Sequence, residues 1–272
     1  MLPASNETIM HTNSPSHTSE QLAEIVELML WTGQLLLEYG ADSNRIERNV
    51  TRIGKALGCE DIHIFISHNS IMITTAVENG FRTKIRRVKK HAINMTIISG
   101  ISRMSWKVLN KELDREAVRS ELHRIANIPS HYPRWLVIVM VGAACASFSQ
   151  LFGGTWLIAG ITFISASVAM FVRQELNLRH YNVFLIILAS ASTASILAGG
   201  LSLLTNAADP SIALASSVLL LVPGVPMINS IKDMVDGYTM VGLTRAINGV
   251  IISLCIALGL LLAMAALGIQ NL

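Results

Sequence analysis

Between Leu219 and Gly237 the chain reads LLLVPGVPMINSIKDMVDG, an apolar run interrupted by two prolines and followed by polar and charged residues. Proline removes a backbone donor and clashes with the preceding turn, which costs about 3 kcal/mol or more inside a helix. In lipid, each freed carbonyl group adds a further cost unless protein or water meets it. The stretch from Pro223 to Pro226 therefore predicts a broken helix whose backbone faces protein or a wet cavity.

The residues that follow the break have the chemistry to hold an anion. Pro226 suits the first turn of a second helix, and Gly237 suits its end. The amides from Val225 to Ile228 would then face the break and could meet an anion there, because a helix dipole favours negative charge at its amino end. The alternative is a packing kink followed by a charged loop. The hypothetical substrate pathway comprises Pro223, Gly224, Val225, Pro226, Met227, Ile228, Asn229, Lys232, Asp233, Asp236 and Arg173.

The polar members of this set have different expected roles. Asn229 is expected as a polar neighbour of the bound anion, and Lys232 could attract that anion toward the break. Asp233 or Asp236 carries a coupled proton, or instead pairs with Lys232 and Arg173. The charged groups could equally lie at the membrane interface, with long side chains reaching water. The sequence alone does not assign one role to each charged residue.

Composition separates a polar half from an apolar half. Of 21 Lys and Arg and 18 Asp and Glu residues, only eight in total follow Arg134. The mean hydropathy of +0.50 and the 51% share of hydrophobic residues are typical of a membrane protein. Crossing about 30 Å of hydrocarbon takes about 20 helical residues, and five apolar segments approach this length. They are 135–152, 155–172, 183–204, 211–231 and 243–267.

Basic residues set the expected orientation of these segments. The loops 153–154 and 205–210 contain no Lys or Arg, whereas the opposite ends carry all the basic residues of this half. The positive-inside rule then places the N-terminal half in the cytoplasm and the C-terminus outside. Small residues are dense in the spans, as in GAACAS at 142–147, and favour close helix packing over a hydroxyl-lined substrate path.

Three regions are expected: a disordered tail at 1–19, a cytoplasmic α+β domain at 20–127, and a five-helix transmembrane domain at 128–272. The fold class is thus an α-helical polytopic membrane protein, with one of its five helices broken at Pro223–Pro226. In the α+β domain, apolar periodicity and turn residues predict helices and strands. Two helices share residues 20–57, separated at Gly40 and with Asp42 or Ser43 as the second cap. Strands at 62–67, 71–77 and 81–88, with a hairpin turn at Asn79-Gly80, precede helices at 90–109 and 112–126.

We interpret the polar clusters of this domain as structural features rather than as catalytic sites. His63, His68 and Asn69 could form an active-site cluster, but a polar turn between strands is the better interpretation. The basic run 82–90 alternates along a strand, which indicates a solvated sheet face, a lipid-facing surface or an attractor for an anionic substrate. Without interleaved aromatic residues it does not indicate nucleic-acid binding. The spacing of His and Cys residues predicts no metal, cofactor or disulfide.

Several long motifs carry a resemblance to a known family. They are SHNSIMITT at 67–75, YPRWLVIVMVGAACASF at 132–148, ITFISASVAMFVRQ at 161–174 and SSVLLLVPGVPMINSIKDM at 216–234, with GAD at 40–42 and INM at 93–95. From about residue 20 to the C-terminus the chain resembles the threonine/serine exporter-like family. The N-terminal tail departs from the family pattern.

The resemblance implies a transporter subunit of the bacterial inner membrane. It implies a smaller YjjB-like membrane subunit as partner, with a higher oligomer left open, and succinate or another small organic acid as the exported substrate. Fused relatives export threonine and serine, so an amino acid is the alternative substrate. Two other classes compete with export: a membrane-anchored hydrolase with its site in the cytoplasmic domain, and a regulatory subunit that only supports its partner.

Overall fold

The chain forms two compact units in a computed structural model that describes residues 19–59, 61–77, 80–89, 91–128, 132–207 and 209–268. The first unit comprises Met1–Ile128 together with Val235–Val241. The second comprises Pro129–Met234 and Gly242–Leu272. Each unit has its own buried apolar residues, so each is described by itself.

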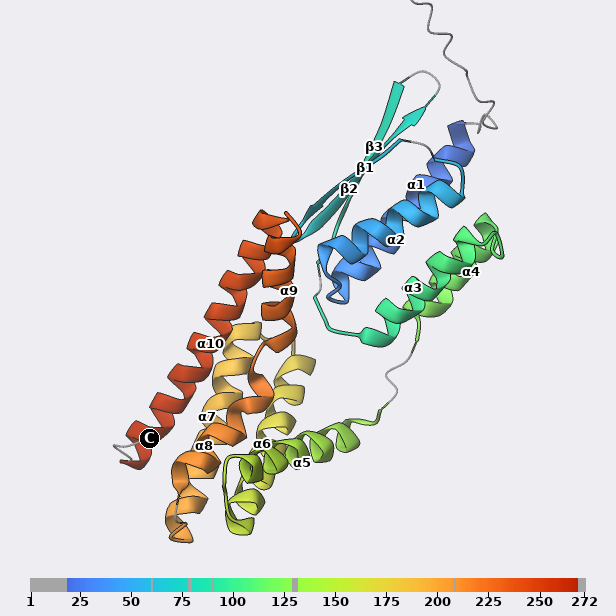
Figure 1. Ribbon diagram of the computed structural model, residues 1–272. Helices are drawn as coiled ribbons and strands as arrows, with labels where there is room; N and C mark the ends of the chain where they lie inside the picture. The colour runs from blue at the N-terminus through green and yellow to red at the C-terminus, as the bar shows by residue number, and fades with distance from the viewer. Residues whose placement is uncertain are drawn as a thin grey trace, which may run out of the picture. The chain divides into compact units, whose positions relative to one another are not determined.

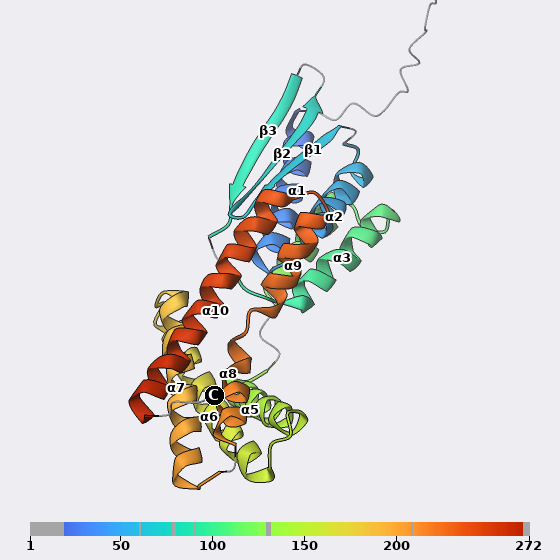
Figure 2. The same ribbon diagram turned by 60° about the vertical axis from the view of Figure 1, so that its left-hand side comes forward.

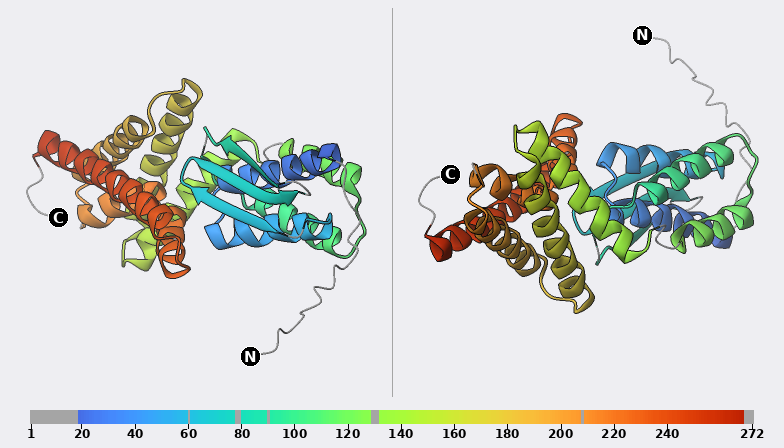
Figure 3. Two further views of the ribbon diagram at one scale, coloured as in Figure 1. Left: turned by 90° about the horizontal axis from the view of Figure 1, so that it is seen from above. Right: turned by 90° about the horizontal axis from the view of Figure 1, so that it is seen from below.

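The first unit consists of a small sheet and two layers of helices. Helices α1 and α2 cover one face of an antiparallel sheet in the order β1-β2-β3, and α3 and α4 pack on the other side of these two helices (Figures 1 and 2). Views from above and below show α1 and α2 running roughly along the strands (Figure 3). The elements are α1 (Ser19–Glu38), α2 (Ser43–Ala56), β1 (Ile62–Ser67), β2 (Ser70–Val77), β3 (Gly80–Arg87), α3 (Met95–Leu109) and α4 (Arg115–Ala126).

Capping residues set the helix boundaries in this unit. Gly40 has a φ of +85° just after α1, and the Asp42 carboxylate accepts a hydrogen bond from the Arg45 amide at 3.0 Å, which caps α2. The helices predicted at 90–109 and 112–126 begin later than expected. Asn94 and Asp114 act as N-caps, so the helices start at Met95 and Arg115.

The strand turns agree only partly with the prediction. His68 and Asn69 form the turn between β1 and β2, as expected, while His63 lies on the exposed face of β1. In the predicted Asn79-Gly80 turn, Gly80 is instead the first residue of β3 and pairs with Val77. Asn79 lies outside the described residues.

The basic side chains of β3 are divided between the two faces of the strand, with Arg87 exposed and Lys84 and Arg86 half-buried. Lys84 and Arg86 point to α1, where both pair with Glu27, and Arg86 also donates to Gln34 at 3.2 Å. Phe81 and Ile85 occupy the exposed face instead. The predicted alternation is confirmed, but the interpretation as a solvated face does not hold for Lys84 and Arg86, because Glu27 of α1 lies opposite them.

The second unit contains α5 (Arg134–Leu151), α6 (Trp156–Leu178), α7 (Val183–Leu204), α8 (Pro210–Val218), η1 (Leu219–Leu221), α9 (Gly224–Val235) and α10 (Thr239–Leu267). Four of these, α5, α6, α7 and α10, are long and apolar enough to cross a membrane. Helix α8 with η1 and helix α9 pass the same test only as a pair bent by 62°, so the described residues hold four candidate spans, or up to five.

Small residues bring these helices into close contact. A Cβ atom added at Gly259 of α10 would lie 2.6 Å from the Cβ of Ala191 on α7. At Gly142 of α5 it would collide with the Ser167 hydroxyl of α6. Such approaches are possible only without a side chain, which confirms the prediction of tight packing at these two positions.

Candidate substrate pathway at the broken helix

The interruption is shorter than the predicted Pro223–Pro226 stretch and begins one residue before it. A single 3-10 turn ends α8 at Leu221, and α9 begins at Gly224, so Val222 and Pro223 separate the two helices. Each half is 12 residues long, about 18 Å at 1.5 Å per residue. Gly237 follows the end of α9 with a φ of +91°, as expected for a residue that terminates a helix.

Protein groups meet most of the carbonyls around the break. The Arg173 guanidinium of α6 donates to the Leu220 carbonyl at 3.2 Å. The carbonyls of Leu219, Val222 and Pro223 accept from the amides of Val222, Gly224 and Met227 at 3.2, 2.9 and 3.1 Å. The carbonyl cost of breaking a helix in an apolar setting is therefore offset by local turns and by one arginine. Arg173, predicted as a partner for aspartate, instead serves the backbone.

Fewer amides of the second half-helix are available to an anion than the hypothesis assumed. Pro226 carries no amide hydrogen, and the Met227 amide already donates to Pro223. Ile228 is the fourth residue after Gly224, so its amide is positioned to donate to a carbonyl of α9 itself. Within the described part of the chain, the Val225 amide has no backbone acceptor, so it is the member of the predicted group open to an anion.

The break is exposed on one side within this unit. Gly224 and Ile228 are exposed and Asn229 is half-buried. A Cβ atom built on Gly224 would meet nothing within 4 Å. Space for a substrate, a lipid or another chain thus lies directly against the backbone at the start of α9.

A buried ion pair joins α9 to α10. Asp233 is fully buried, and its carboxylate lies 2.9 Å from the guanidinium of Arg245, whose side chain is 8% exposed. The sequence hypothesis gave Asp233 either a coupled proton or a pairing with Lys232 and Arg173, and it did not include Arg245 in the site. The available signal was a lone arginine at the start of a long apolar helix, since charges in such settings are usually paired.

Close backbone packing fixes the same two helices. A Cβ atom on Gly242 would lie 2.7 Å from the Ser230 carbonyl oxygen and 3.0 Å from the Met234 nitrogen. A Cβ atom on Gly249 would lie 3.1 Å from Met227. Helices α9 and α10 are therefore in direct contact along the α9 residues that follow the break.

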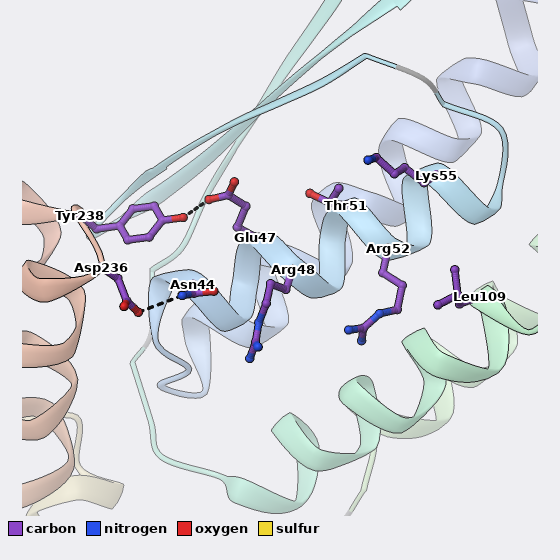
Figure 4. A pocket seen from close by; sticks show the side chains of 9 residues that line it. All are labelled: Asn44, Glu47, Arg48, Thr51, Arg52, Lys55, Leu109, Asp236 and Tyr238. Atoms are coloured by element: carbon purple, nitrogen blue, oxygen red, sulfur yellow. Dashed lines mark hydrogen bonds between the residues drawn. The ribbon is translucent and has the colours of Figure 1, made fainter.

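Asp236 belongs to the first unit, apart from the other predicted site residues. Its carboxylate accepts a hydrogen bond from the Asn44 amide of α2 at 3.0 Å (Figure 4). The neighbouring Tyr238 donates its hydroxyl hydrogen to Glu47 of the same helix. Asp236 thus helps to hold the segment Val235–Val241 against α2, whereas the carboxylate of Asp233 pairs with Arg245.

The alternative histidine cluster forms a stacked pair at the sheet edge. The rings of His68 and His91 lie 4.7 Å apart, and His91 Nε2 is 3.1 Å from the Asn69 side-chain oxygen. His63 lies on β1 opposite Thr74 and takes no part in this contact. The arrangement fits a rigid turn and offers no nucleophile paired with a base.

Comparison with known proteins agrees with a membrane transporter. Residues 27–267 match the ThrE family, described as "Putative threonine/serine exporter". The chain is 34% identical over 254 residues to the "Probable succinate transporter subunit YjjP" of Escherichia coli, covering 93% of this chain and 98% of that protein. The Klebsiella aerogenes protein of the same description is 35% identical, covering 93% and 97%.

A more distant relative is longer than this chain. The "Probable threonine/serine exporter" of Mycobacterium tuberculosis is 19% identical over 250 residues, which cover 91% of this chain and 47% of that protein. No solved structure matches the chain. From the family match over most of its length, together with the two full-length relatives, the chain belongs to the threonine/serine exporter (ThrE) family of membrane transporters.

Proposed function

We propose that this chain is one subunit of an inner-membrane exporter of small organic acids, with succinate as its substrate, and that a smaller YjjB-like membrane subunit completes the transporter. The observation that carries this proposal is the bent pair α8–α9, whose break exposes backbone at Gly224 in a member of a transporter family. Discontinuous helices form substrate sites in other transporters.

The charges around the break suit a carboxylate. Arg173 uses one donor on the Leu220 carbonyl, and a guanidinium has five N–H donors in total. The Val225 amide lies at the amino end of α9, where the helix dipole favours an anion. Arg245 neutralises Asp233, which lessens repulsion of a negative substrate. Lys232 is exposed and, in this proposal, attracts the anion from the cytoplasm.

The requirement for a partner is supported by the lengths of the relatives. Two proteins that the chain matches over nearly their whole length are named transporter subunits. Two that it matches over about half their length are named exporters: the mycobacterial protein and one from Corynebacterium glutamicum, at 47% and 52% of their lengths. We infer that a second membrane subunit supplies what the remaining half of the longer relatives contains.

The proposed topology has five spans, with the bent pair as the fourth, the N-terminal unit in the cytoplasm and the C-terminus in the periplasm. Arg134 supports this arrangement because it bonds to Gln174 at 3.1 Å, so the basic start of α5 and the basic end of α6 are adjacent. By the positive-inside rule, this end faces the cytoplasm.

Export of threonine or serine is the second candidate. The printed descriptions of the family and of the longer relatives favour it. Both substrate classes present a carboxylate, but an amino acid also needs an acceptor for its ammonium group. Asp233 is buried against Arg245, which makes it a poor acceptor and favours the organic acid.

The proposal is tested by removing the break while keeping the fold. The double variant Pro223→Ala/Pro226→Ala should insert normally yet lose most succinate export, because α8 and α9 can then join into a continuous helix. Pro210→Ala is the matched control: Pro210 lies in the first turn of α8, where proline removes no helical bond. Normal export by the double variant would refute the role of the break.

A further inference from the structure

A groove rich in arginine lies on the first unit, between α2 and α3. Its volume is about 470 Å³. We call it the arginine groove, and its lining residues are Arg45, Arg48, Asn49, Arg52, Ser99, Ser102, Arg103 and Trp106. The sequence analysis did not identify it, because its basic residues come from two helices about 50 residues apart along the chain.

The arginines of α2 share one face of that helix. Arg45, Arg48 and Arg52 are spaced by three and four residues, the spacing that aligns side chains along a helix. Arg48 and Arg52 extend from α2 toward α3 (Figure 4). Arg103 on α3 adds the fourth guanidinium group to the lining.

Buried polar contacts hold Arg52 in place. Its guanidinium carbon lies 3.8 Å from the centre of the Trp106 ring, and its Nη1 donates to the Ser105 hydroxyl at 2.8 Å. Ser105 in turn donates to the Asn49 side chain at 2.7 Å, and both residues are buried. Arg52 is thereby preorganised, so a ligand would not have to order this long side chain itself.

The positive charge of the groove is poorly compensated. Among the described residues, no Asp or Glu lines the groove, and only Arg45 of its four arginines has an ion pair, with Asp42 at 3.5 Å. Burial lowers the pKa of Arg52, and the nearby charge of Arg48 lowers it further. Like charges held this close repel each other, and a bound anion would relieve that repulsion.

We propose that the arginine groove binds a small soluble polyanion, a molecule carrying two or more carboxylate or phosphate groups. Guanidinium groups match the oxygens of carboxylate and phosphate in paired hydrogen bonds, and the three arginines of the groove outside any described ion pair suffice for two such groups. The volume is in the range of small-molecule sites, and every lining residue except Trp106 has a polar or charged side chain. This site lies in the first unit and is separate from the residues at the break.

The test is calorimetric titration of the full-length protein in a neutral detergent, with succinate, citrate and pyrophosphate as probes. At least one probe should bind, and Arg48→Gln/Arg103→Gln should weaken its affinity at least tenfold, because each charged hydrogen bond lost costs about tenfold. Both side chains are exposed and outside any described ion pair, so the variant should fold. The single variant Arg48→Gln provides the same readout with a smaller change.

Arg87→Gln is the matched control, because Arg87 is an exposed arginine of β3 outside the groove. Its affinity should stay within about twofold of the unmodified protein, since distant surface charges are screened. Absence of binding by all three probes would overturn the proposal, as would equal affinity in the groove variant and the control. Binding confined to nanodiscs of phosphatidylglycerol would also overturn it, by identifying a lipid headgroup as the ligand. None of these results depends on transport.

Discussion

The ion pair between Asp233 and Arg245 makes a strong prediction about stability. Asp233 is fully buried and the Arg245 side chain is 8% exposed, so removing one partner leaves an uncompensated charge in an apolar setting. Arg245→Met should therefore destabilise the protein by about 3–5 kcal/mol. At roughly 2–4 °C per kcal/mol, the midpoint of thermal unfolding should fall by about 6–20 °C.

The assay is tryptophan fluorescence of the detergent-purified protein during heating. Arg179→Met is the matched control, because Arg179 forms an exposed ion pair with Glu175 and such pairs contribute about 0–1 kcal/mol. The double variant Asp233→Leu/Arg245→Met should recover most of the loss, since a buried pair can be replaced by apolar side chains at little cost. Equal midpoints for Arg245→Met and Arg179→Met would refute this reasoning.

The same double variant separates two roles of Asp233. If Asp233 carries a coupled proton, one of the two roles that the sequence suggested, the stable double variant should fail to export substrate. If the ion pair only fastens α9 to α10, the variant should export at the normal rate. Measuring export and unfolding on the same preparation therefore assigns the residue to one role.

Three further predictions concern packing and reactivity. Gly242→Ala should destabilise the protein by about 1–3 kcal/mol, because its Cβ would lie 2.7 Å from a carbonyl oxygen of α9. Gly200→Ala is the control: its Cβ would meet nothing within 4 Å, so its midpoint of thermal unfolding should equal or exceed that of the unmodified protein. Asn49→Leu should cost about 1–3 kcal/mol in the same assay, because it removes two hydrogen bonds of a buried side chain, one accepted from the Ser105 hydroxyl and one donated to the Arg45 carbonyl. Burial raises the pKa of the Cys59 thiol, so iodoacetamide at pH 8 should label it far more slowly in the folded than in the denatured protein; equal rates would contradict the burial.

Apolar periodicity and turn residues were sufficient to predict most of the helices and strands. Gly40 and Gly237 both have positive φ and end helices where expected, and the break consists of the first of the two prolines and the residue before it. These features depend on local backbone constraints, which a sequence displays directly. The predicted helix boundaries were wrong where a side-chain cap sets the first residue, as at Asn94, because several nearby residues could serve as the cap.

Contacts between distant segments were not predictable in the same way. The pairing of Asp233 with Arg245 and the donation from Arg173 to Leu220 join residues on different helices. The same holds for Lys84, whose strand alternation was evident but whose partner Glu27 was not. Charge alone does not select a partner, because the selection depends on how helices pack.

The most direct test of the transport proposal is uptake of labelled substrate into proteoliposomes that contain this chain, the YjjB-like subunit, or both. The account predicts succinate transport only when both are present, in excess of threonine transport, and loss of that activity in Pro223→Ala/Pro226→Ala. Faster transport of threonine would contradict the assignment of an organic acid. Uptake of both compounds equal to that of empty liposomes, with both subunits correctly inserted, would contradict the transport function itself.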